Sequence, residues 1–355
     1  MARNKSKISQ QHVTAGFAKD LPQHLLVMRN SAMGDVAMLP HALRALQEAY
    51  PQLKITVATP ALFRPFFSGL DVDFLDVDLK QKHHSLFGMR HLAHEARQRG
   101  VDAVADCHDV LRSKAFRLWM MLYGTPSAHI DKGHEDKKRF IRAHGKDQKP
   151  LKHTVIRYCD VFRKLGFVFQ DPQPSKKSKR PNPMGEKQGR WIGFAPFSAQ
   201  TGKTYPDDLS RELVGLLAQR YARVFIHGGG GREEAFAKEM EQKYPNVTAL
   251  WGKVRFQGEL DLISHLDAVV SMDSLVMHMA SLVATPVVSV WGATHPSLGF
   301  LGYGVDPRGV LQGDLACRPC SVYGGKECPL GDHRCMRQVK PQQIVDCIEM
   351  LLKTK

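Results

Sequence analysis

Residues 268–296 read AVVSMDSLVMHMASLVATPVVSVWGATHP, and this stretch decides the fold class. The apolar run 268–271 predicts a buried strand, residues 275–283 predict a helix, and the run 286–291 predicts a second buried strand. Asp273 and Ser274 stand where the helix begins, and both are favoured helix-capping residues. Two fully apolar strands joined by a short helix are typical of a parallel sheet that is covered on both faces.

The same alternation extends outward through most of the chain. It predicts an α/β protein with parallel sheets between helical layers. In the first part we expect strands at 24–29, 54–58, 72–77 and 101–107, and helices at 37–50, 86–99 and 112–123. In the second part we expect strands at 191–195 and 223–227, and helices at 207–221, 233–244, 260–266 and 341–353.

The pattern is interrupted once, over residues 171–190, which are rich in Pro, Lys, Ser and Gly. We interpret this segment as a linker. The chain then divides into a disordered lead-in (1–20), an N-terminal domain (21–170), the linker, and a C-terminal domain (191–355). Two doubly wound, Rossmann-like domains would face each other across a cleft, where ligands bind at the carboxyl ends of the strands.

Charge is divided unequally between the two parts of the chain. Residues 1–190 hold 33 Lys and Arg against 18 Asp and Glu, whereas residues 191–355 hold 17 of each, so the first part carries the whole net charge of +15. A basic domain attracts anions such as phosphorylated glycolipid or lipid headgroups, although a merely solvated surface would have the same composition. No apolar run is long enough for a membrane span, and the polar start is no secretory signal.

Three segments follow predicted strands and carry polar groups suited to catalysis or ligand binding. In the first, RNSAMGD (29–35), Asp35 stands near a helix start, and its spacing leaves two roles open: a helix cap, or a catalytic carboxylate. In the second, 195–206, the side chains of Ser198, Thr201 and Lys203 are suited to a diphosphate, but a plain loop would look similar. It is not a Walker loop, because the spacing of that motif is absent.

The third segment, HGGGG (227–231), opens a helix that carries Glu233 and Glu234 in its first turn. Its glycines, including Gly229, would let a nucleotide approach the backbone, and a flexible turn is the alternative. In the deciding stretch, His278 lies one helical turn after Ser274. It could face the same ligand or be an ordinary core residue.

Taken together, these segments resemble glycosyltransferase family 9, the lipopolysaccharide heptosyltransferases. The resemblance rests on Ser31-Ala-Met-Gly-Asp-Val36, on Asp273-Ser with Met277-His278, and on Thr285-Pro-Val-Val followed by Gly292-Ala-Thr-His-Pro. It covers about residues 24–348. It implies a GT-B fold and a metal-independent, inverting glycosyl transfer from a nucleotide-activated heptose, usually ADP-heptose. The acceptor would be an anionic glycolipid, the lipid A–core, met at the cytoplasmic face of the inner membrane.

The resemblance also implies roles for single residues. Asp35 would be the general base, and Lys203 with Ser198 would stabilise the leaving diphosphate. Asp273, Ser274 and His278 would hold the sugar and phosphates of the donor, and either Glu233 or Glu234 would reach the ribose. Where the family often has Gly after Asp-Ser, this chain has Leu275, which changes the room near the donor.

Four of the seven cysteines, Cys317, Cys320, Cys328 and Cys335, fall within one short segment. Four thiolates could close a structural zinc site, and free thiols are the alternative; catalysis would need neither. A zinc-containing nucleic-acid-binding protein would interleave basic residues with aromatic ones, and the cysteine segment lacks this pattern, so we expect no nucleic acid partner. A nucleotide-sugar epimerase or dehydrogenase would carry an N-terminal dinucleotide fingerprint, which is absent.

Overall fold

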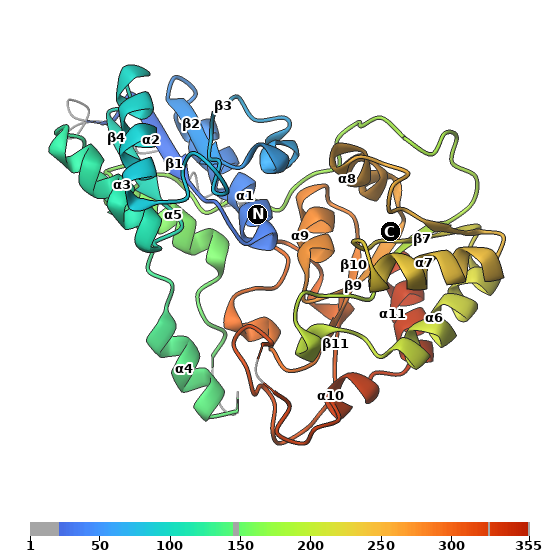
Figure 1. Cartoon of the computed structure of the whole chain (residues 1–355). Helices are drawn as coiled ribbons and strands as arrows, with labels where there is room; N and C mark the ends of the chain where they lie inside the picture. The colour runs from blue at the N-terminus through green and yellow to red at the C-terminus, as the bar shows by residue number, and fades with distance from the viewer. Residues whose placement is uncertain (1–20, 145–148, 326, 354–355) are drawn as a thin grey trace, which may run out of the picture.

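The computed structural model describes residues 21–144, 149–325 and 327–353. The expected lead-in, residues 1–20, lies outside the described residues. Two α/β modules lie side by side (Figure 1), each built on one parallel sheet with helices on both faces. This confirms the predicted fold class.

The N-terminal module contains a five-stranded sheet in the order β3-β2-β1-β4-β5. Its strands are β1 (His24–Met28), β2 (Lys54–Thr59), β3 (Asp73–Asp76), β4 (Ala103–Asp106) and β5 (Ser127–His129). Its helices are α1 (Met33–Ala49), η1 (Ala61–Phe67), α2 (Leu86–Gln98), α3 (Leu111–Leu122), α4 (His134–Arg142) and α5 (Thr154–Lys164).

The C-terminal module contains a six-stranded sheet in the order β11-β10-β9-β6-β7-β8, which is the doubly wound order of nucleotide-binding folds. Its strands are β6 (Trp191–Ala195), β7 (Arg223–Ile226), β8 (Val247–Ala249), β9 (Ala268–Met272), β10 (Val287–Trp291) and β11 (Val310–Gln312). Its helices are η2 (Thr201–Lys203), α6 (Asp207–Arg220), α7 (Arg232–Lys243), α8 (Phe256–His265), α9 (Leu275–Leu282), η3 (Pro296–Leu298), η4 (Pro307–Gly309), α10 (Arg334–Arg337) and α11 (Pro341–Lys353).

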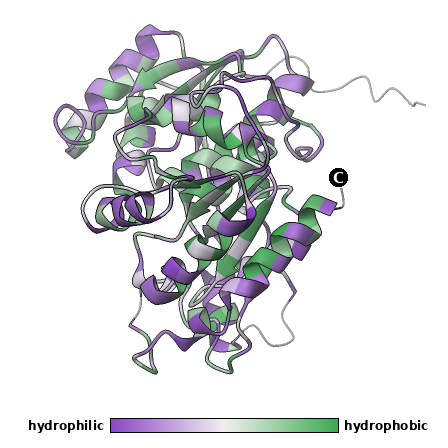
Figure 2. Ribbon diagram, turned by 90° about the vertical axis from the view of Figure 1, so that its right-hand side faces the viewer, coloured by the Kyte–Doolittle hydropathy of each residue, from purple (hydrophilic) through white to green (hydrophobic). Residues whose placement is uncertain are grey.

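Alternating strand side chains divide the hydrophobic core into layers. In β1, Leu26 and Met28 pack under α2 and α3, whereas Leu25 and Val27 face the opposite side, toward α1 and α5. The core on that second side continues without a break into the C-terminal module, where it takes in α8 and α9. Figure 2 shows hydrophobic residues concentrated in this interior. The two modules therefore share one core, and α2 and α3 form the outermost layer of the N-terminal module.

Helices α1 and α9 make the central contact between the modules. A Cβ atom added at Gly34, in the first turn of α1, would lie 3.0 Å from Cδ2 of His278 in α9. Only a glycine lets the α1 backbone come this close to the buried imidazole. This contact places the start of α1 beside the donor-site motif that the sequence suggested.

Between Phe167 and Arg190, the segment that contains the predicted linker, the chain has no helix or strand. The segment is nevertheless attached to both modules. Arg180 forms an ion pair with Asp261 of α8 (2.8 Å) and donates a hydrogen bond to Ser68 of the N-terminal module (3.0 Å). None of the helices in the described part of the chain is long and apolar enough to span a membrane.

One predicted helix start was wrong. The sequence placed the beginning of the first helix at residue 37, but α1 begins at Met33 and its N-cap residue is Ala32. Asp35 is therefore the third residue of the helix rather than its cap. Its carboxylate accepts a hydrogen bond from the Ala32 N–H (3.3 Å), so it satisfies a backbone donor at the helix start from inside the first turn.

The contact between α1 and α9 predicts that Gly→Ala is destabilising at Gly34 but not at a helical glycine outside the contact. Gly34→Ala should lower the free energy of unfolding by about 1–2 kcal/mol, because the new methyl group presses on a buried ring. Gly258→Ala in α8 is the matched control, because its Cβ would have no neighbour nearer than 3.6 Å. There the helix propensity of alanine should raise stability by up to about 1 kcal/mol. Denaturant unfolding measures both values, and a stabilised Gly34→Ala protein would contradict the close contact.

Candidate active site

Asp35 is held in place by a buried arginine. Nη2 of Arg29, just after β1, lies 2.5 Å from Oδ2 of Asp35, and Nη1 donates to the Cys107 carbonyl (2.7 Å). The Tyr158 hydroxyl donates to the backbone carbonyl of Asp35 (3.0 Å), and the Arg29 guanidinium lies over the Tyr158 ring. The carboxylate itself remains partly exposed. Arg29 and Tyr158 thus orient a carboxylate that can still reach a ligand.

Asp35 lies in a pocket that both modules line and whose other charged residues are cations. The pocket has a volume of about 220 Å³. The N-terminal module contributes Arg29, Lys132, Lys137 and Arg157, and the C-terminal module contributes Phe300 and Tyr323. Burial and, second to it, the nearby charge of Arg157 lower the pKa of Lys137 to about 8. An anionic group would relieve this accumulation of positive charge.

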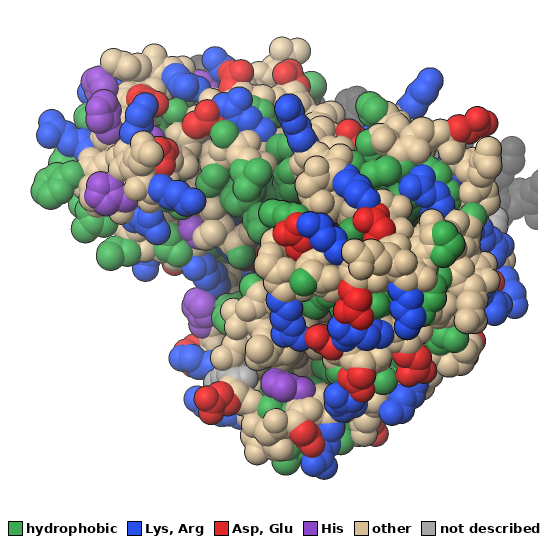
Figure 3. Space-filling model, turned by 45° about the vertical axis from the view of Figure 1, so that its right-hand side comes forward, with side chains coloured by type: hydrophobic (Ala, Val, Ile, Leu, Met, Phe, Trp, Pro, Cys, Tyr) green, Lys and Arg blue, Asp and Glu red, His purple; other side chains and the backbone are tan. Residues whose placement is uncertain are grey.

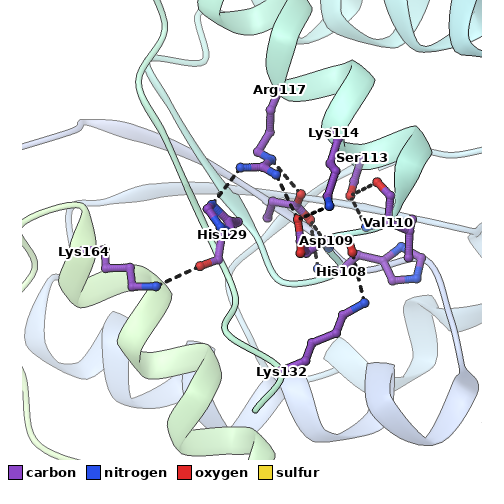
Figure 4. Close-up of polar contacts among 10 residues, drawn as sticks. His108, Asp109, Val110, Ser113, Lys114, Arg117, His129, Lys132 and Lys164 are labelled. Atoms are coloured by element: carbon purple, nitrogen blue, oxygen red, sulfur yellow. Dashed lines mark hydrogen bonds and ion pairs between the residues drawn. The ribbon is translucent and has the colours of Figure 1, made fainter. Parts of the chain in front are cut away.

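The loop after β4 brings His108 to the same pocket, and Lys132, which follows β5, is bound to this loop (Figure 4). Asp109 has a left-handed backbone conformation (φ 43°), and its carboxylate is held by Arg117 (2.9 Å) and Lys114 (3.8 Å). Lys132 donates to the Asp109 carbonyl (3.1 Å). Burial and the nearby charge of Arg29 lower the pKa of His108 to about 3, so this imidazole is neutral at physiological pH. It forms a hydrogen bond with Ser31 (3.1 Å).

In the C-terminal module, Lys203, which the sequence predicts to bind a diphosphate, contacts Asp273 of the donor-site motif. Nζ of Lys203 lies 3.3 Å from Oδ2 of Asp273, which also accepts a hydrogen bond from Thr294 (2.9 Å). Asp273 follows β9 and Thr294 follows β10, so two adjacent strand ends meet the turn that carries Lys203. Thr294 belongs to the quoted Gly-Ala-Thr motif, but sequence reasoning had given it no role.

The segment that holds the cysteines supports this lysine. A Cβ added at Gly324 would lie 2.5 Å from Cγ of Lys203, and one added at Gly202 would lie 2.8 Å from the Gly324 carbonyl. Arg318, between the first two cysteines, is buried and donates to the carbonyls of Gly292 (2.6 Å) and Thr294 (3.2 Å). The segment therefore packs against the turn that carries Lys203. Its Tyr323 lines the pocket that contains Asp35.

The zinc prediction finds no support in the geometry of the thiols. Within residues 21–144, 149–325 and 327–353, no three His, Cys, Asp or Glu side chains are placed to hold one metal ion. All seven cysteines are free of disulfides. Backbone N–H groups of residues 330–333 lower the pKa of the Cys328 thiol, against the opposing effect of desolvation.

The structure also separates the two glutamates that the sequence left equivalent. The Glu233 carboxylate turns back to the glycine loop and accepts a hydrogen bond from the Gly229 N–H (2.6 Å). Glu234 instead pairs with Lys238 one turn along α7 (2.7 Å). Ser198 and Thr201 lie in the turn between β6 and α6, and Ser274 contacts the Ser271 hydroxyl (3.1 Å). The residues predicted to bind the donor all follow the carboxyl ends of strands in the second sheet. Glu234 differs from Glu233 in that its carboxylate pairs with a lysine of its own helix.

His278 lies where the two halves of the site meet. It is buried beside Gly34, and burial lowers its pKa to about 4 despite the opposing charges of Asp273 and Asp35. The imidazole is therefore neutral, and among the described residues its Nδ1 has no hydrogen-bond partner. It packs between α1 and α9, and the charges of Asp35 and Lys203 both act on it.

Comparisons with known proteins agree with the fold and identify the family. The model of "Glycosyltransferase family 9 (heptosyltransferase)" matches residues 89–330. Lipopolysaccharide heptosyltransferase 1 of Escherichia coli O18:K1:H7 is 25% identical over 298 residues, covering 79% of this chain and 89% of that protein. Lipooligosaccharide heptosyltransferase 2 of Campylobacter jejuni (NCTC 11168) is 28% identical over 216 residues, covering 59% and 66%.

Solved structures show the same architecture. A family 9 glycosyltransferase from Veillonella parvula superposes with a TM-score of 0.74 at 18% identity, covering 94% of this chain and 98% of its own. An E. coli heptosyltransferase with ADP superposes with a TM-score of 0.69 at 20% identity, covering 92% and 99%.

Two parallel-sheet modules that line a shared pocket form the GT-B architecture. Within that architecture, the chain belongs to glycosyltransferase family 9, the heptosyltransferase family. The family resemblance seen in the sequence is thus confirmed.

The buried lysine predicts how stability changes with pH. The pKa of Lys137 is 10.5 unperturbed and about 8 in the folded protein, so a charged Lys137 costs stability below pH 8. Between pH 8 and 10.5 the unfolded chain binds more protons, and the stability of the parent protein should rise. Lys137→Met should therefore be more stable at neutral pH, by roughly 3 kcal/mol at most, with the difference shrinking at alkaline pH.

Unfolding by denaturant at pH ~7 and pH ~9.5 measures this difference. Lys138→Met is the matched control, because Lys138 is exposed and pairs with Glu135 on the helix surface. Its stability should be nearly that of the parent at both pH values. A constant difference between Lys137→Met and the parent across this range would contradict the lowered pKa.

Proposed function

We propose that this enzyme transfers heptose from ADP-heptose to an anionic lipopolysaccharide-core acceptor with inversion at the anomeric carbon. One observation carries the proposal: the oriented carboxylate of Asp35 and the Lys203–Asp273 pair belong to different modules but flank the same residue, His278, at the module contact. A general base and a cation for a leaving group are the two elements that a metal-independent transfer needs. An E. coli neighbour in complex with an ADP-heptose analogue supports the choice of donor.

In the proposed reaction, residues 191–355 bind the donor. Lys203, held by Asp273, offers a positive charge to the diphosphate, with the hydroxyls of Ser198 and Thr201 in the same turn. Ser274 and the start of α9 hold the donor near its phosphates. Glu233, bound to the glycine loop at Gly229, is the glutamate placed to meet the ribose. Asp273 both positions Lys203 and keeps this lysine from being an uncompensated buried charge.

Residues 21–170 bind the acceptor in the same proposal. The acceptor hydroxyl approaches Asp35, which takes its proton as the oxygen forms a bond to the anomeric carbon. The bond from that carbon to the diphosphate breaks on the opposite face, and Lys203 stabilises the charge left on the diphosphate. Attack and departure on opposite faces invert the anomeric configuration. The cations Lys132, Lys137 and Arg157 suit phosphate or carboxylate groups of the acceptor.

No cofactor is assigned to the chemical step, because Lys203 supplies the charge that a metal ion would otherwise provide. A structural zinc ion at Cys317, Cys320, Cys328 and Cys335 is a separate hypothesis and has no part in the proposed transfer. We place the enzyme in the cytoplasm, working at the inner membrane, because its proposed acceptor is a lipid.

The role of Lys203 predicts a loss of turnover. Lys203→Ala should lower kcat by about 10²–10³, because it removes a preorganised charge from the leaving group. Lys238→Ala is the matched control, because Lys238 is exposed and pairs only within α7. Steady-state kinetics with ADP-heptose measures both variants, and a fully active Lys203→Ala protein would remove this lysine from the site.

The role of Asp35 makes the sharper prediction. Asp35→Asn should abolish transfer while leaving ADP affinity unchanged, because Asn can still accept the Ala32 N–H bond but cannot take up a proton. Loss of the ion pair to Arg29 will also lower stability, so the assay is done below the melting temperature of the variant. Unchanged ADP binding shows that the donor module is intact. Transfer at the parental rate would assign Asp35 a purely structural role.

A further inference from the structure

The outermost helical layer of the N-terminal module exposes an unusual number of large apolar side chains. Among the described residues, half of all exposed large hydrophobic side chains lie on α2 and α3 alone. They are Leu86, Phe87, Leu111, Leu118, Met121 and Leu122. Most scattered exposed apolar residues need no explanation, but a concentration on two adjacent helices does.

On α3 these residues form a continuous stripe. Leu118 and Leu122 follow Leu111 by seven and eleven positions, so the three share one face of the helix. Their exposed fractions are 71% for Leu111, 52% for Leu118 and 65% for Leu122. The buried residues of α3 are Ser113, Phe116 and Met120, on the opposite face, and the two apolar ones pack under the helix. The helix is therefore apolar on both its inner and its outer face.

Basic residues border this stripe. Arg90 of α2 lies over the Trp119 ring (5.4 Å), and Arg97, two turns further along α2, lies over the Tyr123 ring (4.8 Å). Residues 79–99 and 111–123 together hold eight Lys and Arg against a single acidic residue, Glu95. Aromatic rings with cations beside an apolar stripe are the composition of a helix that lies in a membrane interface. Figure 3 shows hydrophobic, basic and histidine side chains close together on the surface of the N-terminal module.

The same layer is connected to the active site. A cavity of about 440 Å³ opens where α2 and α3 begin, lined by Leu86, Leu111 and Arg112 among others. Ser31 and His108 line this cavity and also the pocket that contains Asp35. A lipid-linked acceptor held at the apolar stripe could therefore extend its polar end past the cations toward the carboxylate.

From these contacts we infer that α2 and α3 dock the enzyme onto an anionic lipid bilayer, with the stripe of Leu111, Leu118 and Leu122 inserted among the lipids and Arg90 and Arg97 at the headgroups. We call this surface the α2–α3 face. The inference deepens the proposed function, because it names the surface by which the enzyme meets the membrane of its acceptor. The opposite face of the sheet is already occupied by the contact with the C-terminal module, so the α2–α3 face is the free side.

Vesicle binding by the full chain tests this directly. The probes are vesicles of phosphatidylcholine with and without phosphatidylglycerol. The variant Leu118→Gln/Leu122→Gln should bind the anionic vesicles about tenfold or more weakly than the parent, because two inserted side chains are lost. Arg90→Gln/Arg97→Gln should lose the preference for anionic over neutral vesicles. Leu62→Gln is the matched control: Leu62 is 58% exposed but lies on η1, which packs against α1 and α8.

Two further measurements separate this inference from the proposed function. Transfer to a water-soluble, acyl-free acceptor should be equal in the parent and in Leu118→Gln/Leu122→Gln, whereas transfer to vesicle-embedded acceptor should fall with vesicle binding. If the parent fails to use the soluble acceptor but vesicle binding follows the prediction, the proposed function fails and the docking face stands.

The docking inference is overturned if Leu118→Gln/Leu122→Gln binds anionic vesicles as well as Leu62→Gln does. It is equally overturned if the parent protein is a dimer that does not bind vesicles and the leucine variant is a monomer. The stripe would then bind a second copy of the chain.

Discussion

The packing of α1 against α9 is the constraint on which the rest of the molecule depends. Gly34 gives the α1 backbone access to the His278 ring, and the shared hydrophobic core on either side holds the two modules together at this point. Asp35 is the next residue after Gly34, and Asp273 lies at the start of α9. A single helix–helix contact therefore sets the position of Asp35, the proposed base, relative to Lys203, the proposed cation for the leaving group. A glycine at position 34 is thus required by the geometry of the site as much as by the packing of the fold.

Charge follows the same division between modules. In the N-terminal module, Arg29, Lys132, Lys137 and Arg157 surround one carboxylate, and the buried histidines nearby are neutral because desolvation lowers their pKa values. In the C-terminal module, Lys203 is balanced by Asp273. The first arrangement has excess positive charge, which suits an anionic ligand. In the second, the lysine is held in place by a carboxylate, and the proposed ligand of this lysine is a diphosphate. The excess basic charge of residues 1–190 is concentrated in part at this pocket and in part on the α2–α3 face.

Much of the fold could be predicted from the sequence, because buried parallel strands and amphipathic helices leave strong local patterns. The strand Trp191–Ala195 and the helix Pro341–Lys353 have the predicted bounds. The prediction missed β5, which is only Ser-Ala-His, and α4, in which six of nine residues are charged. It also missed α5, although that helix is amphipathic. The start of α1 was misplaced because Asp35, a favoured capping residue, acts from the third helical position.

The candidate site was predicted less completely. Motif residues such as Asp35, Lys203 and Asp273 could be chosen because they follow strands, but their supports come from distant segments. Arg29, Thr294 and Gly324 act through contacts that only the folded chain creates, and Lys137 lies on a helix whose sequence suggests a solvated surface. The choice between Glu233 and Glu234 likewise depended on a backbone hydrogen bond.

The most direct test of the whole account is the product of a single reaction. The enzyme is incubated with ADP-heptose and a lipopolysaccharide-core acceptor, and the product is analysed by mass spectrometry and by NMR of the new anomeric centre. The account predicts one heptose added for each ADP released, with an anomeric configuration opposite to that of the donor. Retention of the donor's configuration, or consumption of ADP-heptose without transfer to the acceptor, would contradict it.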